Sequence, residues 1–506
     1  MQKIIHFETL GCRLNQDETE GAARCFSLAD FKCDLENISS SSQENDNVIL
    51  SVINTCTVTA KAEQKARRII RLLLKKFKNA PILVTGCYAE LDADEIKKID
   101  SKRICILSGT KKFILADIAK MMKGKEEISC ELLEKFILEK ENQFKKNLEN
   151  SKNLNFALYT PVFEKHSRAS IKVQDGCNNN CAFCRIHFAR GKSVSLDVND
   201  VVKRVQELEK LGKNEVVFTG VNLSQYAGKF FADDENSNLQ NNQNVQNEKI
   251  CDFADLLKIV LENTENITLR ISSLYPQSVN EKFCDVIKNV RIAPSFHLSV
   301  QSGSDFILGQ MNRPYSVLQV ENAVKMLRLA KKNPFISCDI IAGFPGETQN
   351  DFNQTLELCE KLNFAWIHAF PFSARPGTKA FSMPNQISEK IKDERVKALT
   401  KLAIKSKVNY IDSFIGKTLS AVVENNRSER MILAKGKNSD FNFSSDSDFI
   451  SDLPVNAVTN NFIHVKCDSN KKKFTQGSLV NVKILRSLPF SIQEGRETDA
   501  EAQILL

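Results

Sequence analysis

Short apolar runs alternate with amphipathic segments along the first 140 residues. Three runs rich in β-branched residues, at 3–9, 47–53 and 81–85, each precede a stretch whose apolar residues recur at helical spacing. Such an alternation predicts a parallel sheet with helices on its faces. Residues 1–140 are therefore expected to form an α/β domain, followed by a polar linker without a clear element at 141–165.

A second series of strand-like runs alternates with helical patterns between residues 166 and 413. Six βα units are too few for an eight-stranded barrel and predict a partial (β/α)6 barrel. A long charged helix, roughly Ser388 to Ser413, ends the unit, and a stretch rich in Asn, Gln and acids at 229–250 is expected to be a disordered insertion. The six runs are 169–173, 215–219, 267–272, 295–300, 335–342 and 366–372.

Short apolar runs separated by polar turns follow the long helix. They lie at 418–423, 431–435, 462–466 and 479–485, and predict a small antiparallel β barrel over 414–488. The acid-containing tail at 489–506 is expected to be disordered.

Composition narrows the class of protein. The 506 residues are 42% apolar, and the first apolar run reads as a strand, so neither a membrane span nor a secretory signal is expected. Fifteen cysteines in a chain of this length favour a reducing compartment, the cytoplasm, with metal or cluster ligands among them. A net charge of +8 permits an acidic partner such as RNA.

Three cysteines stand close together after the first barrel strand. Cys177, Cys181 and Cys184 have the spacing CxxxCxxC. Three thiolates this close can hold three irons of a 4Fe–4S cube and leave the fourth open to a ligand. His187 lies three residues further on, so a Cys3His zinc site is the alternative.

Three further cysteines each follow one of the N-terminal strands. Cys12, Cys56 and Cys87 are expected at the carboxyl edge of the parallel sheet, where residues far apart in sequence converge. The alternative is that they are unrelated buried thiols, because free cysteine is a common core residue. Core cysteines of that kind are expected at Cys25, Cys33, Cys105 and Cys130.

The chain resembles the methylthiotransferases of the radical S-adenosylmethionine (SAM) superfamily. That family has an N-terminal methylthiotransferase domain, a radical SAM barrel and a C-terminal TRAM domain, in the order found here. The resemblance covers nearly the whole chain. The matching blocks are Thr9-Leu-Gly-Cys12-Arg-Leu-Asn15-Gln16, Asn54-Thr-Cys56, Thr85-Gly-Cys87, Ser302-Gly-Ser304, Met311-Asn-Arg313, Gly343-Phe-Pro-Gly346-Glu347 and Ser373-Ala-Arg375-Pro-Gly377-Thr378.

This resemblance implies two 4Fe–4S clusters, an auxiliary one on Cys12, Cys56 and Cys87 and a SAM-chelating one on Cys177, Cys181 and Cys184. One SAM would methylate sulfur at the auxiliary cluster. Another would be cleaved to a 5′-deoxyadenosyl radical that takes hydrogen from carbon 2 of adenine 37 of tRNA. A flavodoxin or ferredoxin would supply the electron.

Further contacts are expected at the ends of barrel strands and on basic surfaces. Glycines at strand ends allow a ligand to approach the backbone closely, although each is also an ordinary turn residue. Basic residues on helix 61–78 and in the C-terminal module would bind RNA phosphates, unless they are only solvated. Candidates for SAM are Gly220, Asn222, Ser302, Gly303 and Arg375, and candidates for tRNA are Arg67, Arg68, Arg71, Lys417 and Lys466.

The block around Cys12 is most similar to the subgroup that acts on threonylcarbamoyladenosine in tRNA. The alternatives within the family are isopentenyladenosine 37 and an aspartate of a ribosomal protein. A cation such as Arg313 or Arg375 would pair with the carboxylate of the threonylcarbamoyl group, unless it binds SAM or braces the barrel. The alternative from a different class of protein is a non-catalytic RNA-binding protein with structural zinc. It would explain the basic C-terminal module and one cysteine triad. It would not explain two triads that each lack a fourth nearby thiolate.

Overall fold

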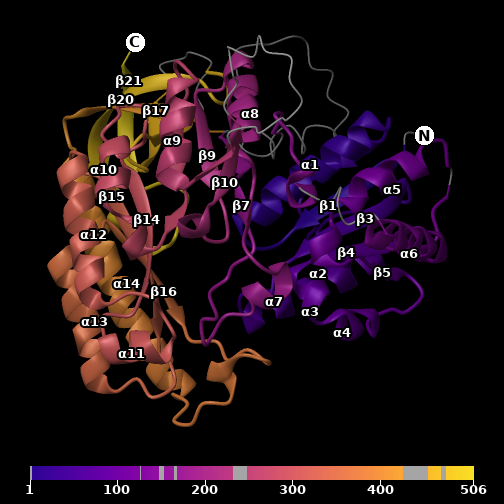
Figure 1. Cartoon of the computed structure of the whole chain (residues 1–506), viewed down its shortest axis with the longest axis horizontal. Coiled ribbons are helices and arrows are strands. Elements are labelled where there is room, and N and C mark those ends of the chain that lie inside the picture. The colour runs from indigo at the N-terminus through magenta and orange to yellow at the C-terminus, as the bar shows by residue number, and fades with distance from the viewer. Residues whose placement is uncertain are drawn as a thin grey trace, which may run out of the picture.

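The computed structural model describes residues 3–125, 127–146, 153–163, 168–231, 248–424, 454–468 and 474–505. The N-terminal domain lies beside the larger barrel, and the C-terminal β barrel sits at one end of that larger barrel (Figure 1). Within the described residues, no helix is both long and apolar enough to cross a membrane.

The N-terminal domain is a five-stranded parallel sheet in the order β2-β1-β3-β4-β5. The three predicted strands are confirmed, and two strands of three residues each, β2 and β5, extend the sheet at its edges. Separate apolar cores bury its two faces. The strands are Ile4–Thr9, Lys32–Asp34, Val48–Thr55, Ile82–Gly86 and Ile104–Ile106; the helices α1 to α6 are Arg13–Leu28, Ala60–Lys76, Cys87–Leu91, Ala93–Lys97, Ile114–Met122 and Cys130–Lys146.

The linker expected at 141–165 has more structure than its polarity indicated. Helix α6 continues through residues 141–146, and a 3-10 turn spans Leu154–Phe156. Phe156 is buried in the core of the larger barrel. One anchoring aromatic residue therefore fixes a segment that is otherwise polar; residues 147–152 and 164–167 lie outside the described part.

The six predicted barrel strands are confirmed and are parallel to their neighbours. They form two sheets, β12-β9-β6 and β13-β14-β15-β16, which meet at a bridge between Leu269 and Ile292. Strands β6, β9 and β12 to β16 span Ala169–Lys172, Glu215–Thr219, Thr268–Ile271, Ser273–Leu274, Ser295–Gln301, Phe335–Ala342 and Trp366–Pro371. Helices α7 to α14 span Ile186–Arg190, Val198–Lys210, Phe253–Glu262, Glu281–Ile287, Asp305–Gln310, Val317–Ala330, Gln349–Leu362 and Glu389–Asp412.

Two short antiparallel pairs accompany the barrel. Strands β7 (Gln174–Asp175) and β8 (Val194–Ser195) pair on either side of the loop that holds Cys177, Cys181 and Cys184. Strands β10 (Gly228–Phe231) and β11 (Glu248–Cys251) pair within the segment predicted as a disordered insertion. That prediction is wrong at both ends of the segment, because paired backbone groups order them; residues 232–247 lie outside the described part.

The C-terminal module is a closed barrel, as predicted, but it has five strands, its β19 and β21 pair in parallel, and its boundary was placed too early. The supposed tail contains helix α16 (Pro489–Gln493) and strand β21, which pairs with both β19 and β20. Ala500, Ala502 and Ile504 alternate with polar residues and are buried. Strands β17 to β21 are Thr418–Val423, Val455–Thr459, His464–Asp468, Leu479–Ser487 and Ala500–Leu505; the predicted strand at 431–435 lies outside the described residues.

Buried cations join the C-terminal module to the larger barrel. The ring of Phe462 lies 5.4 Å from the guanidinium groups of both Arg168 and Arg270. Arg168 also pairs with Glu424 at 3.2 Å. The module therefore closes the end of the barrel opposite the carboxyl ends of the strands.

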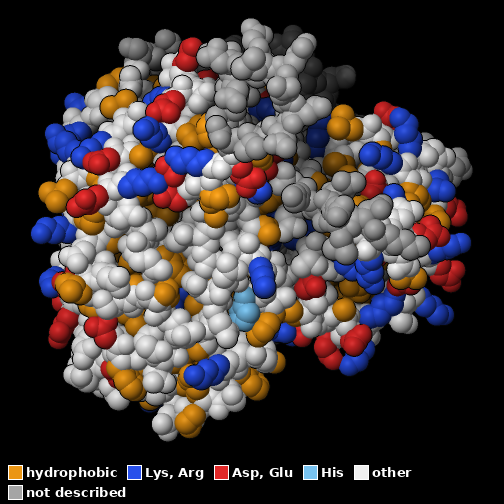
Figure 2. All heavy atoms as spheres, in the orientation of Figure 1, with side chains coloured by type: hydrophobic (Ala, Val, Ile, Leu, Met, Phe, Trp, Pro, Cys, Tyr) orange, Lys and Arg blue, Asp and Glu red, His pale blue; other side chains and the backbone are white. Residues whose placement is uncertain are grey.

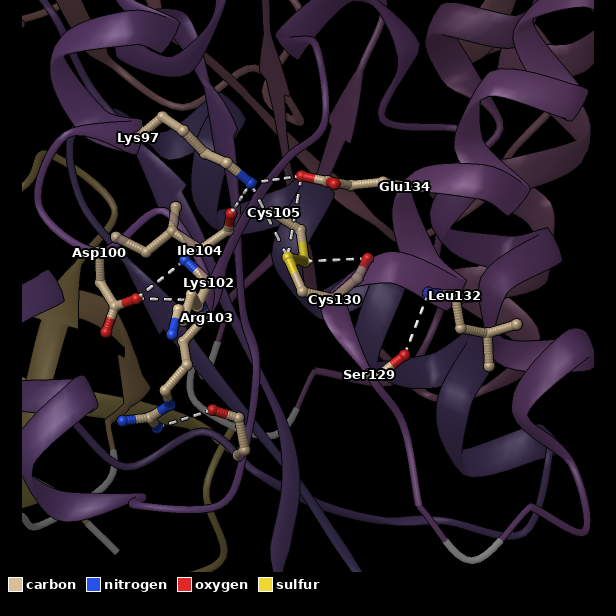
Figure 3. The surroundings of a disulfide bond; sticks show 11 residues. Lys97, Asp100, Lys102, Arg103, Ile104, Cys105, Ser129, Cys130, Leu132 and Glu134 are labelled. Atoms are coloured by element: carbon tan, nitrogen blue, oxygen red, sulfur yellow. Dashed lines mark hydrogen bonds and ion pairs between the residues drawn. A yellow bond between two sulfur atoms is a disulfide. The ribbon is translucent and has the colours of Figure 1, made fainter.

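Two cysteines expected to be unrelated core residues are joined. Cys105 of β5 and Cys130 at the start of α6 form a disulfide, beside Lys97 and Glu134 (Figure 3). The pair was missed because 25 residues separate the two cysteines and only the packing of α6 against the edge strand brings them together. Cys25 and Cys33 are half-buried, and the Cys33 thiol donates to the carbonyl of Ala23 at 3.2 Å.

Candidate active site between the domains

The radical triad, Cys177, Cys181 and Cys184, lies on a loop held at both ends. The Cys177 backbone N–H donates to the carbonyl of Gly191 at 3.0 Å, and the Cys184 N–H donates to the carbonyl of Cys181 at 3.1 Å. Burial raises the pKa of Cys184 to about 12, and the neighbouring thiols of Cys181 and Cys177 add to this effect. The loop thus gathers three sulfurs that favour an electropositive ligand.

Two polar side chains donate to sulfurs of the radical triad. The Asn222 amide, at the end of β9, lies 3.8 Å from Cys177 Sγ. Arg313 Nη1 donates to Cys181 Sγ at 3.2 Å and to the Tyr275 hydroxyl at 2.7 Å. Burial alone would lower the pKa of Arg313, but the hydroxyls of Tyr315 and Tyr275 and the Cys181 thiol hold it above its usual value. Arg313 is therefore a fixed cation beside the triad.

The auxiliary triad, Cys12, Cys56 and Cys87, gathers at the carboxyl edge of the N-terminal sheet. Burial raises the pKa of Cys56 to about 11, with further contributions from the nearby thiols of Cys12 and Cys87. Gly11 adopts a φ of +102°, and a Cβ there would lie 2.8 Å from Cys56 Sγ. The glycine in this block is thus required for the close approach of two loops.

The sulfurs of the two cysteine triads are not arranged as a preformed tetrahedral zinc site. In a tetrahedral zinc site the sulfurs lie about 3.8 Å apart, given the usual Zn–S distance. Within the part of the chain that the structure describes, the one cysteine-containing group of three with all ligand atoms inside 4.8 Å is Cys105, Cys130 and Glu134. Neither cysteine triad meets that limit.

Arg190 links the loop of Cys177, Cys181 and Cys184 to the N-terminal domain near the auxiliary triad. Its side chain is buried at the end of α7 and pairs with Glu18 of α1 and with Asp175, each at 2.9 Å. Its Nη2 donates to Asn15 Oδ1 at 2.7 Å. The thiols of Cys87 and Cys12 are near enough to contribute to the raised pKa of Arg190, although burial opposes that rise.

A second ion cluster spans the same domain interface. Glu63 of α2 accepts from Arg185 at 3.2 Å and from Arg375 through the same carboxylate oxygen. Arg185 also pairs with Asp92 at 2.9 Å, and both arginines donate to the Thr57 hydroxyl. Arg375, a candidate for SAM or substrate, thus contacts the N-terminal domain beside Cys56.

The remaining predicted site residues are the candidates for SAM binding and the basic candidates for tRNA binding. Gly220 packs against Gln174 close to Asn222, whereas Ser302 and Gly303 hydrogen-bond to Thr355 of α13. Of the basic candidates, Arg67 donates to the hydroxyl of Tyr88 at 2.7 Å, and the exposed ones are Arg68, Arg71, Lys417 and Lys466. On the face shown in Figure 2, basic side chains are interspersed with acidic ones over both domains and do not form one patch.

The ionic partners at the interface were not predicted from the sequence. Arg185 directly follows Cys184, and Arg190 lies in the same loop, so their position was a usable signal. Glu18 and Glu63 lie within amphipathic helices, where a charge is usually solvated. Their role appears only when the two domains pack.

Comparison with known proteins agrees with this architecture. Residues 171–359 match the model of the Radical SAM superfamily, and residues 4–108 match Uncharacterized protein family UPF0004.

The chain is 42% identical to threonylcarbamoyladenosine tRNA methylthiotransferase MtaB of Treponema pallidum, over 83% of this chain and 91% of that protein. It is 33% identical to the protein of that name in Thermotoga maritima, over 83% and 87%. It is 27% identical to tRNA-2-methylthio-N(6)-dimethylallyladenosine synthase of Treponema denticola, over 94% and 99%. The chain therefore belongs to the radical SAM methylthiotransferase family, enzymes that use SAM and a 4Fe–4S cluster.

Proposed function

We propose that this protein transfers a methylthio group to carbon 2 of threonylcarbamoyladenosine at position 37 of tRNA. The observation that supports this proposal is the meeting of two cysteine triads at one domain interface, tied together by buried arginines. Two sites are needed because one must release a radical and the other must hold the sulfur. The substrate follows the relatives of higher identity, 42% against 27% for the dimethylallyladenosine synthase.

Each triad has its own task in this proposal. Cys177, Cys181 and Cys184 would hold a 4Fe–4S cluster, which would supply the electron for cleaving SAM to the 5′-deoxyadenosyl radical. Cys12, Cys56 and Cys87 would hold a second cluster, which would supply the site of the sulfur to be methylated.

The neighbouring residues orient these groups. Arg313 and Asn222 donate hydrogen bonds to the radical triad and steady its geometry. The proposed SAM contacts follow the ends of two barrel strands, with Gly220 and Asn222 after β9 and Ser302 and Gly303 after β14. Arg375 would extend this edge toward Cys56. A flavodoxin or ferredoxin in the cytoplasm is the proposed electron donor.

The tRNA contacts are proposed on the exposed basic residues Arg68, Arg71, Lys417 and Lys466. Phosphate contacts position an RNA without reading its sequence, and the anticodon loop then offers an unpaired base to the pocket. Arg67 is proposed to act indirectly, because its guanidinium holds Tyr88, the residue after Cys87.

The experiment is mass spectrometry of tRNA nucleosides from cells with and without the gene for this protein. The methylthio derivative of threonylcarbamoyladenosine should disappear without it and return with the wild-type gene. A gene with Cys181→Ala should not restore it. Loss of methylthio-isopentenyladenosine instead would assign the protein to the other tRNA subgroup, and unchanged tRNA would point to the ribosomal-protein reaction.

A further inference from the structure

Asn15 is a fully buried asparagine in the first turn of α1, shortly after Cys12. Its amide Nδ2 donates to the carbonyl of Leu10 at 2.8 Å and to the carbonyl of Thr55 at 3.1 Å. Leu10 belongs to the loop that leads into Cys12, and Thr55 directly precedes Cys56. One amide group therefore joins the loops of two auxiliary cysteines.

The oxygen of the same amide group faces two cations. Arg190 Nη2 donates to Asn15 Oδ1 at 2.7 Å, and Lys112 Nζ lies 3.5 Å from that oxygen. The two cations can only donate and the two backbone carbonyls can only accept, so this orientation of the amide satisfies all four neighbours. Because Arg190 ends α7, the helix that follows the radical triad, the auxiliary loops receive one of their supports from the larger barrel.

Thr55 extends this chain of hydrogen bonds to the loop of the third auxiliary cysteine. Its hydroxyl donates to the carbonyl of Thr85 at 2.5 Å and accepts from the backbone N–H of Ala89 at 3.3 Å. Thr85 and Ala89 lie on either side of Cys87. The hydrogen bonds of one buried asparagine and one buried threonine thus reach all three auxiliary loops.

The surroundings of Asn15 leave it little freedom to move. The amide Nδ2 of Asn54 donates to the backbone carbonyl of Asn15 at 3.0 Å. Gly11 packs so closely that a Cβ at this position would lie 3.4 Å from Asn15 Nδ2. A buried polar network whose members are all satisfied is rigid. The chain of hydrogen bonds therefore holds the three loops in one arrangement.

We propose that Asn15 is a positioning residue of the auxiliary site, which fixes the spacing of the three cysteine loops and links them to Arg190 of the larger barrel. Residues behind metal ligands set the orientation of those ligands and the retention of the metal. Asn15 acts through the cysteine loops, because its amide N–H groups and its oxygen are already occupied. This assignment rests on the proposed function, in which the auxiliary triad would hold a 4Fe–4S cluster.

The test uses a full-length parent protein in which the three cysteines of the radical triad are replaced by alanine, so that only the auxiliary triad can bind a cluster. Two variants are made in this parent. Asn15→Asp keeps the acceptor for Arg190 and loses both amide donors, whereas Thr55→Val keeps the shape of the side chain and loses the hydroxyl. After anaerobic reconstitution, the rate at which a chelator removes iron and the electron paramagnetic resonance spectrum of the reduced cluster are measured.

Asn461→Asp is the matched control. Asn461 is also a buried asparagine, and its amide donates to the hydroxyl of Tyr410 at 3.1 Å, between the C-terminal module and α14. Iron release should be about tenfold faster in both test variants than in the parent, and their spectra should differ from the parent spectrum. The control should release iron at the parent rate, although it too loses a buried hydrogen bond. Denaturant unfolding of all the variants shows whether their losses of stability are comparable.

Two results would overturn the positioning role. One is iron release at the parent rate, with the parent spectrum, in both test variants. The other is an equal acceleration in the control, which would trace the effect to lost stability. If Asn15→Asp does not fold, Thr55→Val decides, because it preserves the volume of the side chain. A parent protein that binds no iron would contradict the second cluster of the proposed function, and this assignment with it.

Discussion

Arg185 donates a hydrogen bond to the Thr57 hydroxyl at 3.4 Å, and each of these residues directly follows a cysteine of one triad, Cys184 and Cys56. The two cysteine loops are therefore tied to each other by their nearest neighbours in sequence. Radical transfer requires the reacting atoms to be held in one geometry, because a small displacement sharply lowers the rate. The proposed function therefore requires this domain interface to hold the two triads in place.

Glu63 tests this interface. Glu63→Gln removes the carboxylate shared by Arg185 and Arg375 and leaves two buried guanidiniums with weaker partners. We expect a loss of about 3 kcal/mol in the free energy of unfolding. SAM cleavage should persist while methylthio product per 5′-deoxyadenosine falls at least tenfold. Glu95→Gln, on an exposed pair with Lys98, is the control. An unchanged product ratio would show that the interface does not set the geometry.

Substitutions in the two cysteine triads should affect two different activities. Cys177→Ala, Cys181→Ala or Cys184→Ala should abolish 5′-deoxyadenosine formation. Cys12→Ala, Cys56→Ala or Cys87→Ala should leave that activity and stop methylthio transfer. Anaerobic reconstitution should give about eight irons per wild-type chain and about four in each variant. Four irons in the wild type would remove the second cluster.

The free energy of unfolding should depend on pH through Asp17, whose carboxylate accepts a hydrogen bond from the Ser170 hydroxyl across the domain interface. Burial raises the pKa of Asp17 to about 6, above its unfolded value, despite the Ser170 hydrogen bond. The fold therefore favours the protonated carboxyl: this stabilisation is present at low pH and is lost as the pH rises through 6. Relative to wild type, Asp17→Asn should gain about 3 kcal/mol at pH 7.5 and about half of that at pH 5.

Denaturant unfolding of both proteins at the two pH values measures this difference. Asp46→Asn, at an exposed aspartate, should show no comparable change. An Asp17→Asn difference that is the same at pH 5 and 7.5 would mean that Asp17 does not titrate in this range.

The basic residues predict a salt dependence of tRNA binding. Lys417 and Lys466 are exposed on the C-terminal module. If each contacts one phosphate, Lys417→Gln or Lys466→Gln should lower the slope of log K against log salt by about one. Lys258→Gln, on the outer helix α9, is the control and should leave the slope unchanged. Unchanged slopes in both test variants would place the tRNA on the N-terminal helix α2 instead.

Strands with continuous apolar runs were predictable at residue level. The runs at 215–219 and 335–342 coincide with β9 and β15, because both are buried and flanked by turn residues. Cys177, Cys181 and Cys184 were singled out by their CxxxCxxC spacing, and Cys12, Cys56 and Cys87 by their strand-end positions. Strand β21 was missed because alanines supply most of its buried face, and alanine is a weak strand signal.

The ion pairs across the domain interface could not be predicted from the sequence. Glu18 pairs with Lys112, Lys172 and Arg190, which come from three distant segments. No local pattern distinguishes such a glutamate from a solvated one, because the distinction arises only from burial after packing.

The most direct test of the substrate is a competition assay with the reduced, reconstituted enzyme. Two forms of one tRNA, with threonylcarbamoyladenosine or isopentenyladenosine at position 37, are supplied together, and methylthio products are counted by mass spectrometry. The account predicts that the threonylcarbamoyl form is consumed and the isopentenyl form is left unmodified. Equal consumption of both forms, or preference for the isopentenyl form, would contradict it.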